Sequence, residues 1–304
     1  MPTRRQLLLA ASLLPITSIA RPEASTLKPS RIIKKPIPSS GEEIPVIGIG
    51  TNRFGVGDDR EALAMLKATL KHFAQMGGGM IDTAPSYRGS ERVIGQLIDE
   101  LGLADAFFMG TKCDEQGGNA TLEQLASSKA KLMSGKLDLV SVHNLRNWQK
   151  QLPVLRDAKA AGEIRYHGIT TWRGRQHEEF EAVMESEKLD FVQVSYSLAN
   201  RKIEDRILKI AADKGIAVVV NLAFARGQLF SAVKDKALPS WAAEFDANSW
   251  GQFFLKYVVS HPSVTCAIPG TTKLHHLEDN LGAALGRLPT TEQRADMEKL
   301  FDAF

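Results

Sequence analysis

Eight short apolar runs rich in Val and Ile recur along the chain, separated by longer segments with helical spacing. Short continuous apolar runs of this kind are typical of strands that are buried on both faces. The predicted strands cover residues 46–50, 79–82, 107–111, 137–142, 164–169, 191–194, 217–220 and 265–268. Strands that alternate with helices favour a parallel sheet covered by helices on its outside.

The intervening segments carry apolar residues at every third or fourth position, which predicts amphipathic helices. They cover residues 60–75, 122–133, 148–161, 178–187, 201–214 and 250–261. A chain of 304 residues is long enough for a (β/α)8 TIM barrel, which needs about 250 residues. A doubly wound open sheet would show a similar alternation, but no GxGxxG motif follows the first predicted strand. We therefore expect an α/β fold, a (β/α)8 barrel.

The segment before the first strand predicts a β-hairpin. Residues 33–46 hold two apolar stretches around Ser39, Ser40 and Gly41, a polar turn. We expect this hairpin to cap one end of the barrel. The expected organisation is a signal peptide at residues 1–20, a linker at residues 21–30 and the barrel at residues 31–304.

The first twenty residues resemble a bacterial twin-arginine (Tat) export signal. Residues 3–9 read TRRQLLL, and the apolar run that follows continues to Ala20. Ser18, Ile19 and Ala20 supply a small-x-small cleavage site. We expect the Tat translocase as a partner during export, a periplasmic location, and no stable membrane association after cleavage; an uncleaved membrane anchor is the alternative.

Charge and cysteine content narrow the classes of function. The chain has 38 Lys and Arg against 35 Asp and Glu, a net charge of +3, which gives no reason to expect a nucleic acid partner. Its two cysteines, Cys113 and Cys266, match no zinc, haem or disulfide-framework spacing. We predict no metal site. Cys113 directly follows Lys112 and could lie beside the site, but we expect it to be a small buried thiol.

Four polar residues lie at or just after successive predicted strand ends. Asp82 ends the second strand and Tyr87 follows five residues later, while Lys112 and His143 follow the third and fourth strands. Active sites of β/α barrels lie at the carboxyl ends of the strands, so these side chains should meet at one mouth. Each residue alone could be structural, as a lone His often is. Together they predict a catalytic site.

The motifs around these residues resemble those of the aldo/keto reductase family. The chain reads IDTAPSY at residues 81–87, SERVIG at 90–95, GTK at 110–112 and SVHN at 141–144, in the family's order. The resemblance runs from the hairpin to about Ala284. It implies hydride transfer between NADP(H) and an aldehyde or ketone, or the corresponding alcohol, with Tyr87 as general acid and base.

Elementary chemistry assigns each of the four residues a task in such a reaction. Hydride delivery to a carbonyl carbon builds negative charge on the oxygen, which a positioned acid must neutralise. A free tyrosine has a pKa of about 10, and a nearby lysine ammonium would favour its phenolate and strengthen it as a donor. We expect Asp82 to hold Lys112 charged, and a neutral His143 to hydrogen-bond and orient the substrate oxygen.

The resemblance also implies a set of cofactor-binding residues. They are Thr51, Asn52, Asp82, Thr170, Thr171, Gln193, Asn221, Phe224, Gly270, Thr271, Lys273, His276 and Asn280. Many relatives place a tyrosine that stacks on the nicotinamide where this chain has Asn221, and Phe224 is its expected substitute. Few positively charged residues are expected around the 2′-phosphate of NADP(H). We therefore predict NADP(H) as the cofactor, with NAD(H) as the alternative.

Two other functions compete with this interpretation. One is a weakly catalytic member of the same fold that keeps its cofactor as a redox sensor or binding subunit. The other is a different barrel enzyme, such as a phosphate-binding lyase or isomerase. The substrate is a small carbonyl or alcohol compound whose pocket could be walled by Phe54, Trp172, Trp241 and Trp250, although each could equally be a core or surface aromatic.

Overall fold

The computed structural model describes residues 32–134 and 137–304. The predicted signal peptide and linker lie outside the described residues. In the part of the chain that the structure describes, no helix is both long and apolar enough to cross a membrane.

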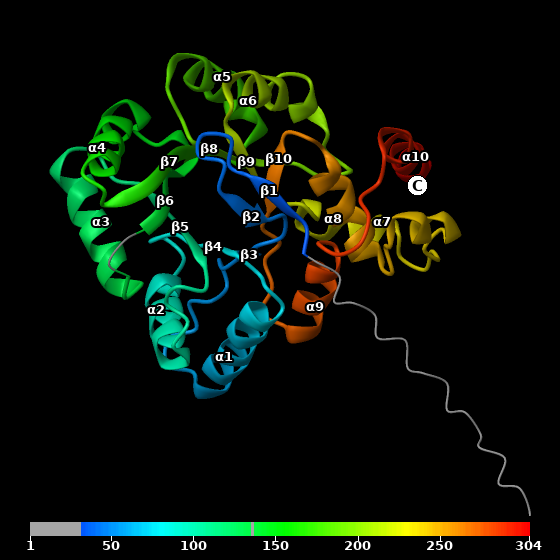
Figure 1. Cartoon of the computed structure of the whole chain (residues 1–304), viewed down its shortest axis with the longest axis horizontal. Helices are drawn as coiled ribbons and strands as arrows, with labels where there is room; N and C mark the ends of the chain where they lie inside the picture. The colour runs from blue at the N-terminus through cyan, green and yellow to red at the C-terminus, as the bar shows by residue number, and fades with distance from the viewer. Residues whose placement is uncertain (1–31, 135–136) are drawn as a thin grey trace, which may run out of the picture. The chain divides into compact units, whose positions relative to one another are not determined.

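Eight parallel strands of the described segments form one sheet, in the order β10-β9-β8-β7-β6-β5-β4-β3. They are β3 Ile49–Gly50, β4 Met80–Asp82, β5 Phe108–Cys113, β6 Leu137–Val142, β7 Ile164–Thr170, β8 Phe191–Ser195, β9 Ala217–Asn221 and β10 Val264–Ala267. The two edges of the sheet meet, since the Gly48 amide donates to the Ala267 carbonyl at 2.8 Å and the Ala267 amide donates to the Val46 carbonyl at 2.9 Å. The sheet therefore closes into the predicted barrel (Figure 1).

The first strand is shorter than predicted. Residues 46–50 were expected to form it, but β3 contains only Ile49 and Gly50. Val46 follows directly on the hairpin strand, and Ile47 pairs with Ala267 through a single bridge. This stretch joins the two edges of the barrel instead of forming a regular ladder.

The predicted hairpin is present and caps the barrel. Strands β1 Lys34–Pro36 and β2 Glu43–Pro45 pair in antiparallel fashion and lie across the ring of strands (Figure 1). Ile37 and Ile44 of the hairpin pack in one buried cluster with inward residues of the strands, such as Phe108. The Tyr166 hydroxyl of β7 donates to Ser40 in the turn at 2.7 Å. One end of the barrel is thus filled and tied to its cap.

Helices cover the outside of the barrel. They are α1 Arg60–Gln75, α2 Ser90–Leu101, α3 Asn119–Lys131, α4 Trp148–Ala160, α5 His177–Ser186, α6 Ile207–Lys214, α7 Gln228–Ala232, α8 Trp250–Ser260, α9 Leu274–Gly282 and α10 Thr291–Asp302. Five of the six predicted helices agree to within three residues at each end. The predicted helix at residues 201–214 begins later, as α6, because Lys202–Glu204 forms a 3-10 turn. Four further helices, α2, α7, α9 and α10, lie outside the six ranges given above.

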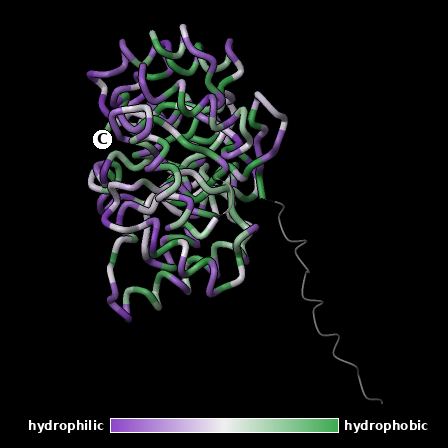
Figure 2. Tube along the Cα trace, turned by 90° about the vertical axis from the view of Figure 1, so that its left-hand side faces the viewer, coloured by the Kyte–Doolittle hydropathy of each residue, from purple (hydrophilic) through white to green (hydrophobic). Residues whose placement is uncertain are grey.

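The main core lies between the strands and the helices. The apolar face of α2 shows how it forms: Val93, Ile94, Leu97 and Ile98 recur at helical spacing and are all buried. Hydrophobic colour gathers on the inner segments of the trace, and hydrophilic colour is more frequent at its margins (Figure 2). Cys113 and Cys266 are both free and buried, which confirms the expectation for Cys113.

Candidate active site

A cavity of about 600 Å³ opens at the carboxyl ends of the strands. This volume lies within the range that small-molecule sites occupy. Eleven of the predicted site residues line it: Thr51, Asn52, Asp82, Tyr87, Lys112, His143, Thr170, Gln193, Asn221, Phe224 and Gly270. The four predicted catalytic residues therefore share one cavity.

The strands bring these side chains together because they are parallel and neighbouring. Asp82 ends β4, Lys112 lies near the end of β5, and His143 follows β6 in a 3-10 turn at His143–Leu145. Gln193 of β8 donates to Asp82 Oδ1 at 2.9 Å. Since β4 and β8 are not neighbours in the sheet, this bond spans the interior of the barrel.

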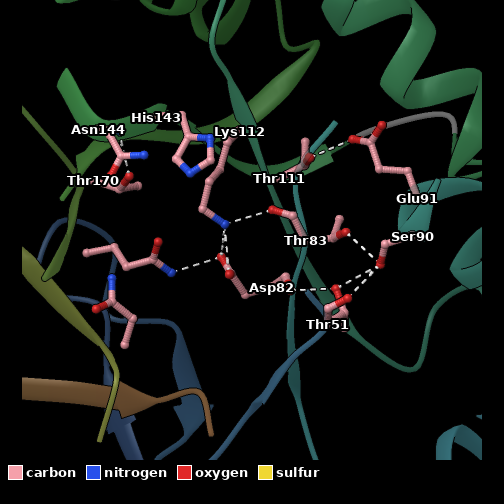
Figure 3. Close-up of polar contacts among 12 residues, drawn as sticks. Thr51, Asp82, Thr83, Ser90, Glu91, Thr111, Lys112, His143, Asn144 and Thr170 are labelled. Carbon is pink, nitrogen blue, oxygen red and sulfur yellow. Dashed lines mark hydrogen bonds and ion pairs between the residues drawn. The ribbon is translucent and has the colours of Figure 1, made fainter. Parts of the chain in front are cut away.

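Lys112 and Asp82 form a buried ion pair at the bottom of the cavity. Lys112 Nζ donates to both carboxylate oxygens of Asp82, at 2.8 and 2.7 Å, and to the Thr83 carbonyl at 2.7 Å (Figure 3). Only 2% of Lys112 and 6% of Asp82 are exposed. Burial alone would lower the pKa of Lys112, but Asp82 and Tyr87 outweigh it and raise that pKa. Lys112 is therefore held as an ammonium.

Tyr87 lies beside this ammonium. Lys112 Nζ is 5.1 Å from the centre of the Tyr87 ring, and the His143 ring meets Tyr87 edge-on with 6.1 Å between ring centres. Burial raises the pKa of Tyr87, and the opposing effect of Lys112 is smaller, so the net shift is upward. The lysine acts in the predicted direction, but desolvation dominates. Tyr87 is accordingly a neutral phenol that holds its proton.

Hydrogen bonds and one close backbone approach position the loop that carries Tyr87. Ser90, the first residue of α2, donates to the Thr51 carbonyl at 2.9 Å, and the Thr51 hydroxyl donates to the Asp82 carbonyl at 2.8 Å (Figure 3). A Cβ at Gly55 would lie 2.3 Å from the carbonyl oxygen of Arg88 and 2.7 Å from that of Tyr87. Glycine therefore lets the loop after β3 pack against the Tyr87 loop.

Two loops at the mouth contain left-handed backbone at residues other than glycine. Asn144, after β6, has φ 54°, and its backbone N–H donates to the Thr170 hydroxyl at 3.1 Å. After β9, Leu222 and Arg226 have φ 51° and 57°. Such conformations cost of order 1 kcal/mol or more and gather at functional sites.

Two cavity-lining amides have a buried oxygen that lacks a hydrogen-bond partner among the described residues. These atoms are Oδ1 of Asn144 and Oδ1 of Asn221. Asn221 donates through Nδ2 to the Thr171 carbonyl at 3.3 Å, which fixes the orientation of its amide. Buried polar atoms normally find a partner, so both oxygens are suited to accept a hydrogen bond from a ligand.

Five of the predicted cofactor residues do not line the cavity. They are Thr171, Thr271, Lys273, His276 and Asn280. Thr171 is buried, and its hydroxyl donates to Gln176 at 2.7 Å. The other four lie just before α9 or on it, and their role stays a prediction.

Of the four aromatic residues proposed as pocket walls, only Trp172 lines the cavity. Phe54 is fully buried in the core. Trp241 and Trp250 both pack against Phe253, at 5.6 and 5.2 Å between ring centres. These three are core or packing residues.

Among the polar and charged residues of the site, sequence reasoning missed four: Arg53, Asp114, Asn144 and Arg226. Arg53, Asn144 and Arg226 line the cavity, and Asp114 contacts His143. Each lies in a loop that follows a predicted strand, and that placement was the available signal. Arg226 also lies over the Trp172 ring, 4.6 Å from its centre.

Comparison with known proteins agrees with this geometry. A family model described as the aldo/keto reductase family matches residues 46–300. Aldo-keto reductase YhdN of Bacillus subtilis is 28% identical over 64% of this chain, and the match spans 62% of that protein, less than two thirds. An NADH-specific methylglyoxal reductase of Escherichia coli is 25% identical over 69% of this chain and 72% of its own length. A crystal structure of an aldo-keto reductase from Klebsiella pneumoniae in complex with NADPH is 25% identical, with a TM-score of 0.73 over 89% of this chain and 96% of that one.

Proposed function

The chain belongs to the aldo/keto reductase family, and on that premise we propose that it transfers a hydride between NADP(H) and an aldehyde or ketone, or the corresponding alcohol. Family membership supports an oxidoreductase that acts on carbonyl groups. The observation that carries the finer proposal is the buried Lys112 ammonium, paired with Asp82, beside the Tyr87 phenol in one cavity.

The residues that line the cavity suit a nicotinamide cofactor. The unpartnered oxygens of Asn144 and Asn221 would accept hydrogen bonds from a carboxamide group, and Phe224 offers a ring in the same cavity. Gly270 pairs with Gly50 at the end of β3 through a single bridge, and both residues line the cavity without a side chain.

Two arginines would bind the phosphate groups. Arg53 and Arg226 line the cavity. Asp82 is the acidic residue among those that line it, and Asp82 already pairs with Lys112. Their guanidinium groups match the geometry of phosphate oxygens. We favour NADP(H) because the Klebsiella pneumoniae neighbour was solved with NADPH, whereas the name of the Escherichia coli relative makes NAD(H) the alternative.

The chain's own residues would handle the charge that develops on the substrate oxygen. The bound nicotinamide supplies the hydride that reduces the carbonyl carbon. Tyr87 donates its hydroxyl proton to the oxygen, which gains the electron pair of the broken π bond, and the product is an alcohol. Lys112 stabilises the phenolate that remains until it regains a proton from solvent.

Replacement of Tyr87 by Phe tests this assignment. Turnover of a probe aldehyde, 4-nitrobenzaldehyde, with NADPH should fall by about 10²- to 10⁴-fold, while quenching of NADPH fluorescence on binding should stay the same. Tyr166→Phe is a matched control, because this hydroxyl contacts Ser40 at the opposite end of the barrel. Unchanged turnover in Tyr87→Phe would remove Tyr87 as the acid. Slow single turnover without a steady state in the unmodified enzyme would favour a redox sensor.

We also propose that residues 1–20 direct export through the Tat translocase into the periplasm, on the basis of Arg4 and Arg5 and the apolar run after them. The test is expression of the full chain in bacteria with and without a working Tat translocase, followed by fractionation and intact mass measurement. Export that depends on Tat, with loss of residues 1–20, is expected. Unprocessed protein in the cytoplasm of both strains would contradict it.

A further inference from the structure

His143 has a carboxylate partner on the side of its ring that carries Nδ1. Asp114 Oδ2 lies 3.3 Å from His143 Nδ1, and the exposed fractions of the two side chains are 13% and 14%. Asp114 comes two residues after Lys112, directly beyond the end of β5. The contact therefore ties the loop after β5 to the turn after β6, next to the reacting groups.

Other contacts fix Asp114 in this orientation. The Asp114 amide donates to Gln124 Oε1 at 2.9 Å, and Gln124 Nε2 donates to Asp114 Oδ1 at 3.2 Å. Arg146 donates to the Asp114 carbonyl at 3.1 Å. The hydrogen bond with His143 is the largest of the effects that lower the pKa of Asp114 to about 2. Asp114 is thus an ionised carboxylate, which only accepts hydrogen bonds.

An accepting partner determines which nitrogen of the His143 ring carries the hydrogen. Because Asp114 cannot donate, the hydrogen must be on Nδ1 of His143. A neutral imidazole has one such hydrogen, so its Nε2 is then a bare acceptor. Nε2 can donate to a carbonyl oxygen only when the ring carries both hydrogens, as imidazolium.

The other charged groups near His143 are already balanced. Lys112 is paired with Asp82, and Tyr87 holds its proton. Arg146, from the end of the same turn, binds the backbone of Asp114 rather than its carboxylate. From β7, the hydroxyl of the neutral Thr170 accepts from the backbone N–H of Asn144, the residue after His143. Asp114 is therefore the counter-ion available to a protonated His143.

We propose that Asp114 is a positioning residue that keeps a hydrogen on Nδ1 of His143, so that His143 donates to a carbonyl oxygen only as imidazolium and accepts from an alcohol hydroxyl when neutral. This inference rests on the proposed function and replaces the expected neutral donor. Carbonyl reduction should then require the protonated ring and fall as pH rises, and alcohol oxidation should gain from the neutral ring.

The hydrogen position can be measured without any turnover. In the full chain labelled with ¹⁵N-histidine, the His143 signals are identified among the seven histidines by their loss in His143→Gln. At high pH the ring should show the hydrogen on Nδ1, and in Asp114→Leu, which has no acceptor, it should move to Nε2. A neutral ring with its hydrogen on Nε2 in the unmodified protein overturns the inference and leaves the proposed reductase function intact.

The pH profile supplies the second readout. For reduction of 4-nitrobenzaldehyde with NADPH, the falling limb of kcat/KM should shift to lower pH in Asp114→Asn, because the imidazolium loses its counter-ion. Glu115→Gln is the matched control: it removes a charge from the neighbouring residue, which contacts Gln124 instead of His143, and should leave the limb in place. Coincident profiles for Asp114→Asn and the unmodified enzyme would refute the positioning role.

Discussion

Replacement of Lys112 by Met should destabilise the protein by about 3–5 kcal/mol, because it leaves a buried charge without its partner. Lys112 provides two of the hydrogen bonds to the Asp82 carboxylate, and among the described residues only Gln193 would remain as a donor to it. The Asp82 side chain is only 8% exposed, so solvent cannot compensate for the lost ammonium.

The matching experiment is a double-mutant cycle followed by urea unfolding. At an m-value of about 3 kcal/mol per molar urea, the expected loss lowers the midpoint by about 1–1.7 M. The double variant Asp82→Asn with Lys112→Met has no buried charge at this position and should recover most of the loss.

An exposed ion pair provides the control for this cycle. Lys67 and Glu100 are separated by 2.8 Å, like the buried pair, but 41% and 39% of their side chains are exposed. Lys67→Met should cost less than about 1 kcal/mol. If Lys112→Met costs no more than this control, or if the double variant is no more stable than the single one, the reasoning from burial is refuted.

Two further predictions concern the loop at Gly55 and the acid stability. Gly55→Ala should lower kcat/KM by about 10- to 100-fold, because the added Cβ must displace the backbone of Tyr87 and Arg88. Gly174→Ala is the control, since a Cβ there meets nothing within 4 Å and should leave kcat/KM unchanged. Equal effects of the two substitutions would contradict the argument. The pKa of Asp114 is lowered from 3.8 to about 2, so the folded state binds fewer protons than the unfolded state between these values. The contribution of Asp114 to stability is complete above about pH 3.8 and is lost as pH falls through about 2. The difference in urea midpoint between the unmodified protein and Asp114→Asn should therefore shrink over that range. A constant difference would be evidence against this linkage.

The sequence predicts the strands well because a buried parallel strand is apolar on both faces. It predicts helices less completely. The spacing of Val93, Ile94, Leu97 and Ile98 carries the signal for α2, although the predicted ranges do not include it. The sequence of α10, TEQRADMEKLFD, is largely polar, and only Arg294 and Met297 are buried in it, so its apolar stripe is weak.

The candidate site was predictable where position along a strand determines position in space. Asp82, Lys112 and His143 meet because their strands are neighbours in a parallel sheet. The partner of His143 could not be predicted, because its contact depends on how two loops pack. The net direction of the Tyr87 pKa depends on burial, which the sequence does not report.

The hairpin that caps the barrel affects how ligands enter and leave the cavity. Because Ile37 and Ile44 plug that end, the cavity at the strand ends is reached from the other side. Two molecules that enter through this one opening must bind in order. The molecule that binds deeper binds first and leaves last, so its slow release would limit the rate of turnover.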